Sequence, residues 1–423
     1  MASLEYWIWF ASLRGLRAKT RRALLDRFES PRDVFFADRR ELARLELSPA
    51  ELEALEQRDL HAADGILARC EELDVRVLTM QDAAYPQRLR AIPEPPAVLY
   101  VSGRLPDVDG EPVVALVGTR HSSPYGDKMA RSIAYELASK GAVVATGLAG
   151  GIDSRAAEGA LMAGGRVIGV LGVAINDVYP RWNGRLYDDV RASGALVSEY
   201  PPDAKGTGAW FPMRNRILAG LSLGVAVCEA PERSGALITA HRALDYGRDV
   251  FAVPGNADAA GFRGSNNLLR EGAIIAESGA DILREYAARF PDKIRLEADG
   301  AIPEGAAIPE ETRRAERTER KKEKPEPPGK GFLKLRVPTK RKKQTEAAAA
   351  AAKPPAIADQ LAGLTENQLK IVGVMAKPNM HVDDIIDLSA LPASAVLSEL
   401  TILQIKGFVS QSPGKRFTLN ITK

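Results

Sequence analysis

The fold is decided by the stretch VVALVGTRHSSPYG, residues 113–126. Its first five residues form a short apolar run rich in β-branched valine, which is typical of a strand buried on both faces. Glycine, hydroxyl and charged residues follow, and a helix is expected from about Asp127. This order of buried strand, polar turn and helix predicts one unit of a parallel sheet.

Five further apolar runs repeat the pattern toward the C-terminus, and helical segments lie between most of them. The expected strands are Val113–Val117, Ala142–Ala145, Val167–Leu171, Ala195–Ser198, Val225–Glu229 and Val250–Val253. Apolar strands that alternate with helices predict a parallel sheet covered on both faces. The fold class is therefore α/β, with a Rossmann-like parallel-sheet core over residues 76–290.

The segment ahead of this core has a helical pattern. The pattern of residues 1–75 predicts short helices arranged as in a helix-hairpin-helix (SAM-like) domain. One helix runs to Phe28 and ends at Ser30-Pro31, and another extends from Arg39 to Leu47. Residues 85–103 are rich in proline and predict an extended strap that leads into the core.

The segments after the core differ again. Residues 297–355 combine prolines, mixed charge and an alanine run, which predicts a disordered basic linker. Residues 361–423 predict a winged-helix domain. Its expected elements are a helix capped by Thr365 and ending near Met375, helices at Val382–Leu388 and Ala393–Ile405, and a hairpin of Phe408-Val409 with Phe417–Leu419.

Composition limits the class of protein. The 423 residues are 45% hydrophobic, which is enough for a large folded core, and no apolar run is long enough to span a membrane. The first ten residues lack a basic segment and a cleavage site, so no signal peptide is expected. The two distant cysteines and four scattered histidines have no metal-ligand spacing. A reduced, cytoplasmic environment follows as the expectation.

The charge is unevenly distributed. Residues 310–343 contain 14 Lys and Arg against 6 Asp and Glu, a net charge of +8, so the rest of the chain carries −5 of the overall +3. The folded parts are therefore not broadly basic. Any site for a polyanion on them is expected to be local, built from a few arginines and backbone amides.

The turn after the first strand is the first candidate site. Gly118, Thr119, Arg120 and Ser123 combine a glycine, hydroxyls and a guanidinium with the amides at a helix N-terminus. Such a set forms an anion cradle at the carboxyl edge of a parallel sheet, and the arginine fork matches phosphate oxygens. An ordinary strand-to-helix turn with a solvated arginine explains the same residues equally well.

A second turn, TGLAGGID at 146–153, is rich in glycine. Gly147, Gly150 and Gly151 let a ligand approach the backbone closely. Their spacing is not that of a dinucleotide-binding turn, and no suitable acidic residue follows, so no nucleotide cofactor is expected. Asp153 is interpreted as the N-cap of the next helix.

Three further clusters are expected at the same edge. Trp210 and Phe211 precede Arg214, Asn215 and Arg216; Ser234 and Gly235 open a helix; and Asn266 follows a glycine turn. Aromatic rings next to arginines suit single-stranded nucleic acid, because rings stack on bases while charge holds phosphate. The two aromatic residues are interpreted as core, the two arginines as functional. Asn266 either contacts phosphate or caps a helix at 267–271.

The residues do not form a catalytic set. His121 and His241 have no partner nucleophile and carboxylate, and they are expected on the surface. A phosphate-binding loop with its lysine is absent from the sequence, so ATP hydrolysis is not expected.

Seven ordered motifs resemble the DNA-processing protein A family (DprA, also called Smf). They are GTRHSSPYG at 118–126, TGLAGGID at 146–153, SEYPP at 198–202, FPMRNRILAGLS at 211–222, EAPERSGALITA at 229–240, VFAVPG at 250–255 and GSNNLLREGA at 264–273. The strap at 85–103 is also similar. The resemblance is close over about residues 80–285 and looser at both ends.

The resemblance implies a non-enzymatic protein that binds single-stranded DNA, forms a homodimer through its core and loads RecA during natural transformation, with single-strand-binding protein as a further partner. It places DNA contacts at Arg120, Ser123, Arg214 and Arg216. Two departures stand out: Ala157 replaces a usual histidine, and residues 206–208 lack a basic residue that members often carry, with Lys205 the nearest substitute.

Two expectations remain open. The third helix of the winged-helix domain has Glu399 as its only charged residue, so this domain is expected to bind protein, or DNA only weakly. The alternative function is that of a Rossmann-like nucleoside-monophosphate phosphoribohydrolase. The glutamate that such an enzyme needs is missing, because Thr239, Ala240 and His241 stand in its region.

Overall fold

The structure is a computed structural model that describes residues 3–13, 15–42, 44–298, 300–302, 365–375, 380–389, 391–392, 396, 399–400, 403–404, 408–412 and 416–419. The chain divides into two compact units, Met1–Gly331 and Phe332–Lys423. Most of the expected linker, from residue 303 onward, lies outside the described residues. Most of the expected third helix of the winged-helix domain does so too.

Short helices form the start of the first unit. They are α1 (Leu4–Ser12), α2 (Ala18–Arg27), α3 (Pro31–Phe36), α4 (Arg39–Leu42), α5 (Pro49–Glu56) and α6 (His61–Glu72). Ser30-Pro31 ends the preceding helix as expected, but it also starts α3, since Ser30 caps it and Pro31 occupies its first turn. The expected helix from Arg39 to Leu47 was too long: α4 ends at Leu42, and Ser48 caps α5.

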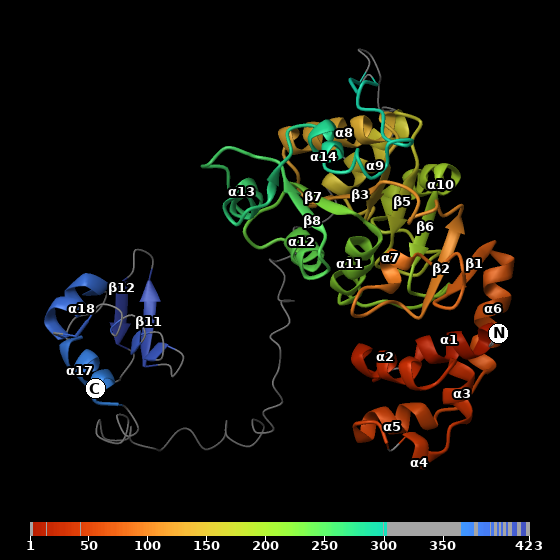
Figure 1. Ribbon diagram of the computed structural model, residues 1–423, viewed down its shortest axis with the longest axis horizontal. Coiled ribbons are helices and arrows are strands. Elements are labelled where there is room, and N and C mark those ends of the chain that lie inside the picture. Colours follow the sequence, from red (N-terminus) through yellow and green to blue (C-terminus); the bar gives the residue numbers. More distant parts are fainter. Residues whose placement is uncertain are drawn as a thin grey trace. The chain divides into compact units, whose positions relative to one another are not determined.

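A nine-stranded sheet lies at the centre of the first unit (Figure 1). The strands are β1 (Val75–Thr79), β2 (Val98–Gly103), β3 (Val113–Gly118), β4 (Val143–Thr146), β5 (Val167–Val170), β6 (Ala195–Ser198), β7 (Gly224–Glu229), β8 (Asp249–Ala252) and β9 (Ile274–Ile275). Their order is β1-β2-β6-β5-β4-β3-β7-β8-β9, and all pairs from β6 to β9 are parallel. All six expected strands are confirmed.

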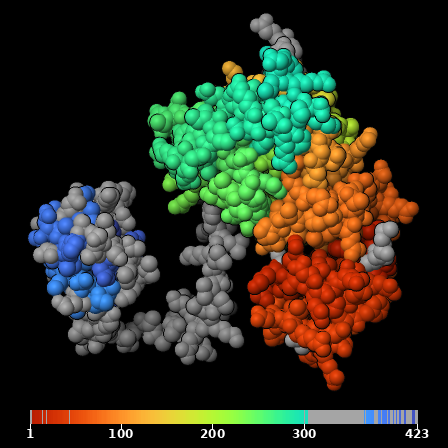
Figure 2. Space-filling model, in the orientation of Figure 1, coloured from red at the N-terminus to blue at the C-terminus, as the bar shows by residue number. Residues whose placement is uncertain are grey.

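The proline-rich strap is only partly extended chain. It contains the short helix α7 (Gln87–Arg90) and ends in β2, which pairs antiparallel with both β1 and β6. Residues 75–103 therefore extend the parallel sheet by two antiparallel strands. Figure 2 shows the N-terminal helices packed against this segment, and α1 contacts both β1 and β2.

Helices cover both faces of the sheet, as expected (Figure 1). Alternate residues of β3 point to opposite faces, so Val114 and Leu116 join one apolar core while Val113, Ala115 and Val117 join the other. The first face carries α8 (Pro124–Ser139), α9 (Ile152–Met162), α10 (Gly184–Ser193) and α14 (Gly279–Arg284). The second carries α7, α11 (Trp210–Leu221), α12 (Gly235–Asp245) and α13 (Arg263–Arg270).

The described part of the second unit has the elements of a winged helix. Thr365 caps α17 (Glu366–Val374), and α18 (Val382–Ser389) follows. The expected hairpin is confirmed as β11 (Val409–Ser412) and β12 (Arg416–Leu419), to which the short strand β10 (Met380–His381) adds a third member. Among the described residues of the chain, no helix is long and apolar enough to cross a membrane.

Candidate nucleic-acid interface

The candidate site lies where the parallel strands end at their carboxyl edge. The chain runs β3 to β6 outward on one side and then returns to place β7 beside β3. The loops after β3 and β7 therefore leave the sheet in opposite directions, which is where open parallel sheets bind ligands. The predicted clusters lie in the segments that follow β3, β4, β6, β7 and β8.

Arg120 is exposed in the loop after β3, and its guanidinium lies against two aromatic rings. The carbon of the guanidinium is 5.4 Å from the centroid of Tyr179 and 4.8 Å from that of Phe211. Nη1 donates a hydrogen bond of 3.3 Å to the Tyr179 hydroxyl. The two rings also contact each other, with centroids 4.9 Å apart. One cation and two rings thus form a single surface.

The glycine turn after β4 packs under this surface. Gly151 has a φ of +73°, and a Cβ there would collide with the carbonyl oxygens of Thr119 and Arg120. Around Gly150 there is more room, since a Cβ would lie 3.7 Å from the Trp182 ring. The close packing of this turn therefore fixes the backbone that carries Arg120.

Arg214 is buried behind the same turn. It is 5% exposed, and a Cβ on Gly147 would collide with its guanidinium and with the Asp153 carboxylate. Burial raises the pKa of Asp153, and the charge of Arg214 opposes that rise. Burial likewise lowers the pKa of Arg214. Asp153 is not the helix N-cap that we expected: Gly151 takes that position, and Asp153 faces inward from the first turn of α9.

Ser123 meets a carboxylate at the expected anion cradle. Its backbone N–H and its hydroxyl both donate to Oε2 of Glu229 at 2.9 Å, and its hydroxyl accepts from the N–H of Gly126. Glu229 ends β7 and is buried. A Cβ on Gly126 or on Gly261 would strike this carboxylate. The protein itself therefore supplies the negative charge at the N-terminus of α8.

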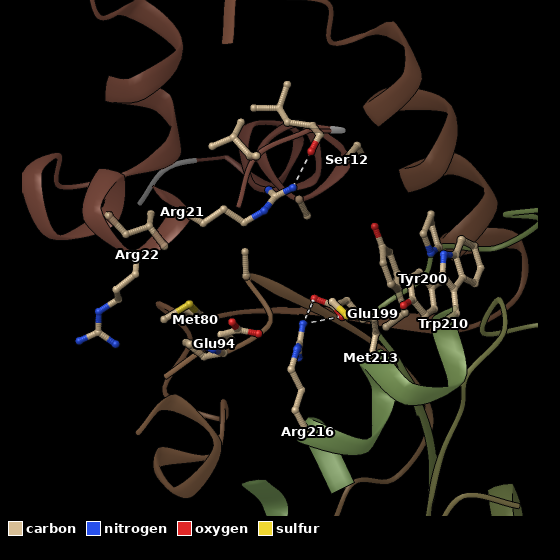
Figure 3. Close-up of a pocket in the computed structure, with 18 of the residues that line it drawn as sticks. Ser12, Arg21, Arg22, Met80, Glu94, Glu199, Tyr200, Trp210, Met213 and Arg216 are labelled. Carbon is tan, nitrogen blue, oxygen red and sulfur yellow. Dashed lines mark hydrogen bonds and ion pairs between the residues drawn. The ribbon is translucent and has the colours of Figure 1, made fainter. Parts of the chain in front are cut away.

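Arg216 lies apart from Arg120, in a cavity of about 570 Å³ under the N-terminal helices (Figure 3). It is 6% exposed, and Nη2 donates to both carboxylate oxygens of Glu199 at 2.6 and 2.7 Å. Arg21 reaches the same cavity from α2 and donates to the carbonyl oxygens of Phe10 and Leu13. Burial lowers the pKa of Arg21 to about 10.

The remaining predicted residues hold backbone in place. Asn266 donates to the carbonyl of Gly255 at 3.0 Å and accepts from its N–H at 3.1 Å, so it clamps one residue from both sides. It lies within α13 and is not its cap. Ser234 caps α12. Asn215 donates to the carbonyl of Gly235, while the Cα of Gly235 faces open space.

Comparison with known proteins gives the family. The model of "DNA recombination-mediator protein A" matches residues 76–287, and that of the "DprA winged helix domain" matches residues 347–415. The Smf protein of Synechocystis is 32% identical over 425 residues, and the alignment covers 99% of both chains. The chain belongs to the DNA recombination-mediator protein A family.

Two further members of this family show how much of the chain is shared. DNA processing protein DprA of Streptococcus pneumoniae is 42% identical over 205 residues, which cover 48% of this chain and 72% of that protein. The crystal structure of DprA from the same species superimposes with a TM-score of 0.58 at 34% identity, over 67% of this chain and 99% of that one. The fold and the family resemblance are confirmed together.

Sequence reasoning missed three parts of this family member's site. Phe211 was interpreted as core, but it is half-buried and supports Arg120. Tyr179 and Trp182 were not considered, although the run Tyr179-Pro-Arg-Trp182 after a strand is an aromatic and basic signal that could have found them. Glu229 ends an apolar strand, and no local pattern indicates that it turns back onto Ser123.

Proposed function

We propose that this protein binds single-stranded DNA across the carboxyl edge of its sheet. The observation that carries the proposal is the exposed Arg120 guanidinium resting on Tyr179 and Phe211. A cation held on two rings offers charge for a phosphate and flat faces for unpaired bases in one place. Paired bases cannot use such faces, which favours a single strand over a duplex.

We assign the direct contacts to exposed groups. The exposed Arg120 binds phosphate, and the strand passes over the half-buried backbone of Gly118, Thr119 and Gly150 toward Asn215, Ser234 and Gly235. Gly147 and Gly151 are buried and shape the turn beneath the strand. Ser123, Arg216 and Asn266 support these groups from below, because each already forms hydrogen bonds within the protein. Arg214 does so as well, because it is buried next to the Asp153 carboxylate. Their roles are therefore in shaping the interface.

We further propose that the protein protects incoming DNA and loads RecA onto it during natural transformation, displacing single-strand-binding protein in the cytoplasm. One copy of such a small interface binds modestly, and two linked copies hold one strand more tightly through effective concentration. A homodimer is therefore part of the proposal. The exposed Leu244 on α12 supports an interface on the core. The family assignment supports this function, not the phosphoribohydrolase alternative, and we propose no catalysis.

The test is a binding titration of the full chain with single-stranded and duplex oligonucleotides of equal length at several salt concentrations. We expect preference for the single strand and a salt dependence equivalent to a few phosphates, at a slope of about −0.7 per phosphate. Equal affinity for both forms would refute the proposal. Light scattering measures whether the protein dimerises, and RecA ATPase measurements on single strands coated with single-strand-binding protein test the loading of RecA. A strictly monomeric protein that leaves the RecA ATPase rate unchanged would refute RecA loading but not the binding of single-stranded DNA.

A further inference from the structure

A second hollow lies at the same edge of the sheet, on the side of β7 and β8. It has a volume of about 730 Å³, within the roughly 300–1,000 Å³ of small-molecule sites. Its walls come from the start of α8 and from the segment after β8. They are formed by Ser123, Pro124, Tyr125, Pro254, Asn256 and Phe262.

The floor of this hollow is held rigidly. Tyr125 donates from its hydroxyl to the carbonyl of Pro254 at 3.2 Å, and Asn266 clamps Gly255 beside it. Phe262 is buried behind Tyr125, with ring centroids 5.6 Å apart. Tyr125 as a whole residue is nevertheless 45% exposed. An aromatic ring braced from behind and open in front is suited to stacking.

A phosphate does not fit the hollow. Glu229 already accepts from the N–H and hydroxyl of Ser123, and the N–H of Gly126 is bonded to Ser123. These two amides at the start of α8 are therefore occupied, and a second negative charge would lie close to the buried carboxylate. The occupant that fits is flat and uncharged, and the exposed Asn256 amide can both donate to it and accept from it.

The hollow continues the candidate DNA interface. Arg120 lies in the loop after β3, the strand at the centre of the parallel region, and Tyr125 lies in the first turn of α8, into which that loop leads. The rings of Tyr179 and Phe211 lie toward β5 and β6, whereas Tyr125 and Phe262 lie toward β8. Lys128, one turn after Tyr125, and Arg263 are both exposed. Their positive charges can bind the phosphate backbone of a strand that runs along the edge of the hollow.

We propose that Tyr125 forms a second base-stacking subsite, in which an unpaired base of the bound strand lies on its ring while the strand crosses from β5 to β8. This inference rests on the proposed binding of single-stranded DNA. The bound strand would then run across the sheet edge past two aromatic subsites, the rings of Tyr179 and Phe211 and the ring of Tyr125, with Arg120 between them. A strand long enough to cross the loop after β3 contacts both aromatic subsites, whereas a very short strand contacts only that of Tyr179 and Phe211.

The test compares full-length Tyr125→Ala, Tyr125→Phe and Arg120→Ala with wild type in titrations of oligothymidylates of about 4 and about 12 nucleotides. Stacking on an aromatic ring is worth about 1–3 kcal/mol per base, so Tyr125→Ala weakens binding of the longer strand by about fivefold or more. Tyr125→Phe restores most of that loss because it keeps the ring. Phe36→Ala, which removes an exposed ring from the N-terminal helices, is the matched control and leaves affinity unchanged.

Photocrosslinking of the wild-type chain to strands with a single 5-iodouracil gives a readout that needs no variant. We expect crosslinks to Tyr125 from positions in the strand displaced from those that crosslink to Phe211 or Tyr179. If Arg120→Ala weakens binding, but Tyr125→Ala binds the longer strand like wild type and no position crosslinks to Tyr125, the second subsite is refuted and the proposed function stands. If wild type binds no single strand, both are refuted.

Discussion

The guanidinium carbon of Arg120 lies 4.8 Å from the centroid of the Phe211 ring. Arg120 comes from the loop after β3 and Phe211 from the first turn of α11, so only the folded chain brings them together. The attraction between such a cation and ring contributes about 0.5–1 kcal/mol at an exposed position. In the proposed interface, its main effect is to hold the arginine in one place before a strand binds.

Replacing Phe211 with alanine should weaken binding of single-stranded DNA by about fivefold or more, since it removes a stacking face and releases Arg120. Fluorescence anisotropy with a labelled oligonucleotide measures the change. The control is Met213→Ala on the same helix, because Met213 lines the cavity beneath the N-terminal helices. An equal loss in both variants would point to damage to α11 as the cause.

Substitutions of Arg120 should separate charge from geometry. Arg120→Ala should weaken binding several-fold and make the salt dependence less steep by about 0.7, the contribution of one phosphate on a single strand. Arg120→Lys should recover the salt slope but not the full affinity, because lysine lacks the planar fork and the flat face. Unchanged affinity in Arg120→Ala, with an unaltered thermal melt, would move the site elsewhere.

Gly147→Ala should destabilise the first unit by about 1–3 kcal/mol, because the new Cβ has no space beside Arg214 and Asp153. Urea denaturation measures the loss. Gly184→Ala is the matched control, since Gly184 lies in a helix and a Cβ there meets no atom within 4 Å. A Gly147→Ala protein as stable as wild type would show that the buried pair has room to move.

Glu51 should make the N-terminal helices sensitive to acid. Its buried carboxylate accepts from Arg17, Thr20 and Ser48, and these bonds lower its pKa well below the ordinary 4.5. A lowered pKa contributes stability that is present above about pH 4.5 and is lost as the pH falls toward the folded-state pKa. Glu51→Gln should therefore cost about 1–3 kcal/mol at pH 7.

The same substitution should cost progressively less below pH 4.5, where wild-type Glu51 also becomes protonated on unfolding. Urea denaturation of wild type and of Glu51→Gln at pH 7 and at a series of lower pH values measures the difference in their free energies of unfolding. A difference that stays constant down to the most acidic sample would show that hydrogen bonding by the neutral side chain, not charge, carries the stability.

Local pattern was enough to predict the parallel sheet. Each of its six main strands is a short apolar run, and a helix or turn residue marks where it ends, so the information lies within about ten neighbouring residues. The two antiparallel strands β1 and β2 were missed because prolines immediately precede the second, and because their places depend on pairing with each other and with β6.

By itself, the sequence determined the fold class, the family and the loops that form the candidate interface. The tertiary structure alone decided which of the predicted side chains are exposed and which are buried against other parts of the protein. Arg214 and Arg216 are close neighbours on α11, yet one lies beside Gly147 and the other pairs with Glu199 in a separate cavity. The spacing of residues along the sequence gives the face of the helix on which a side chain lies, but not which segment of the chain packs against that face. Arg120 gains its rings, and Ser123 its carboxylate, only from segments distant in the chain.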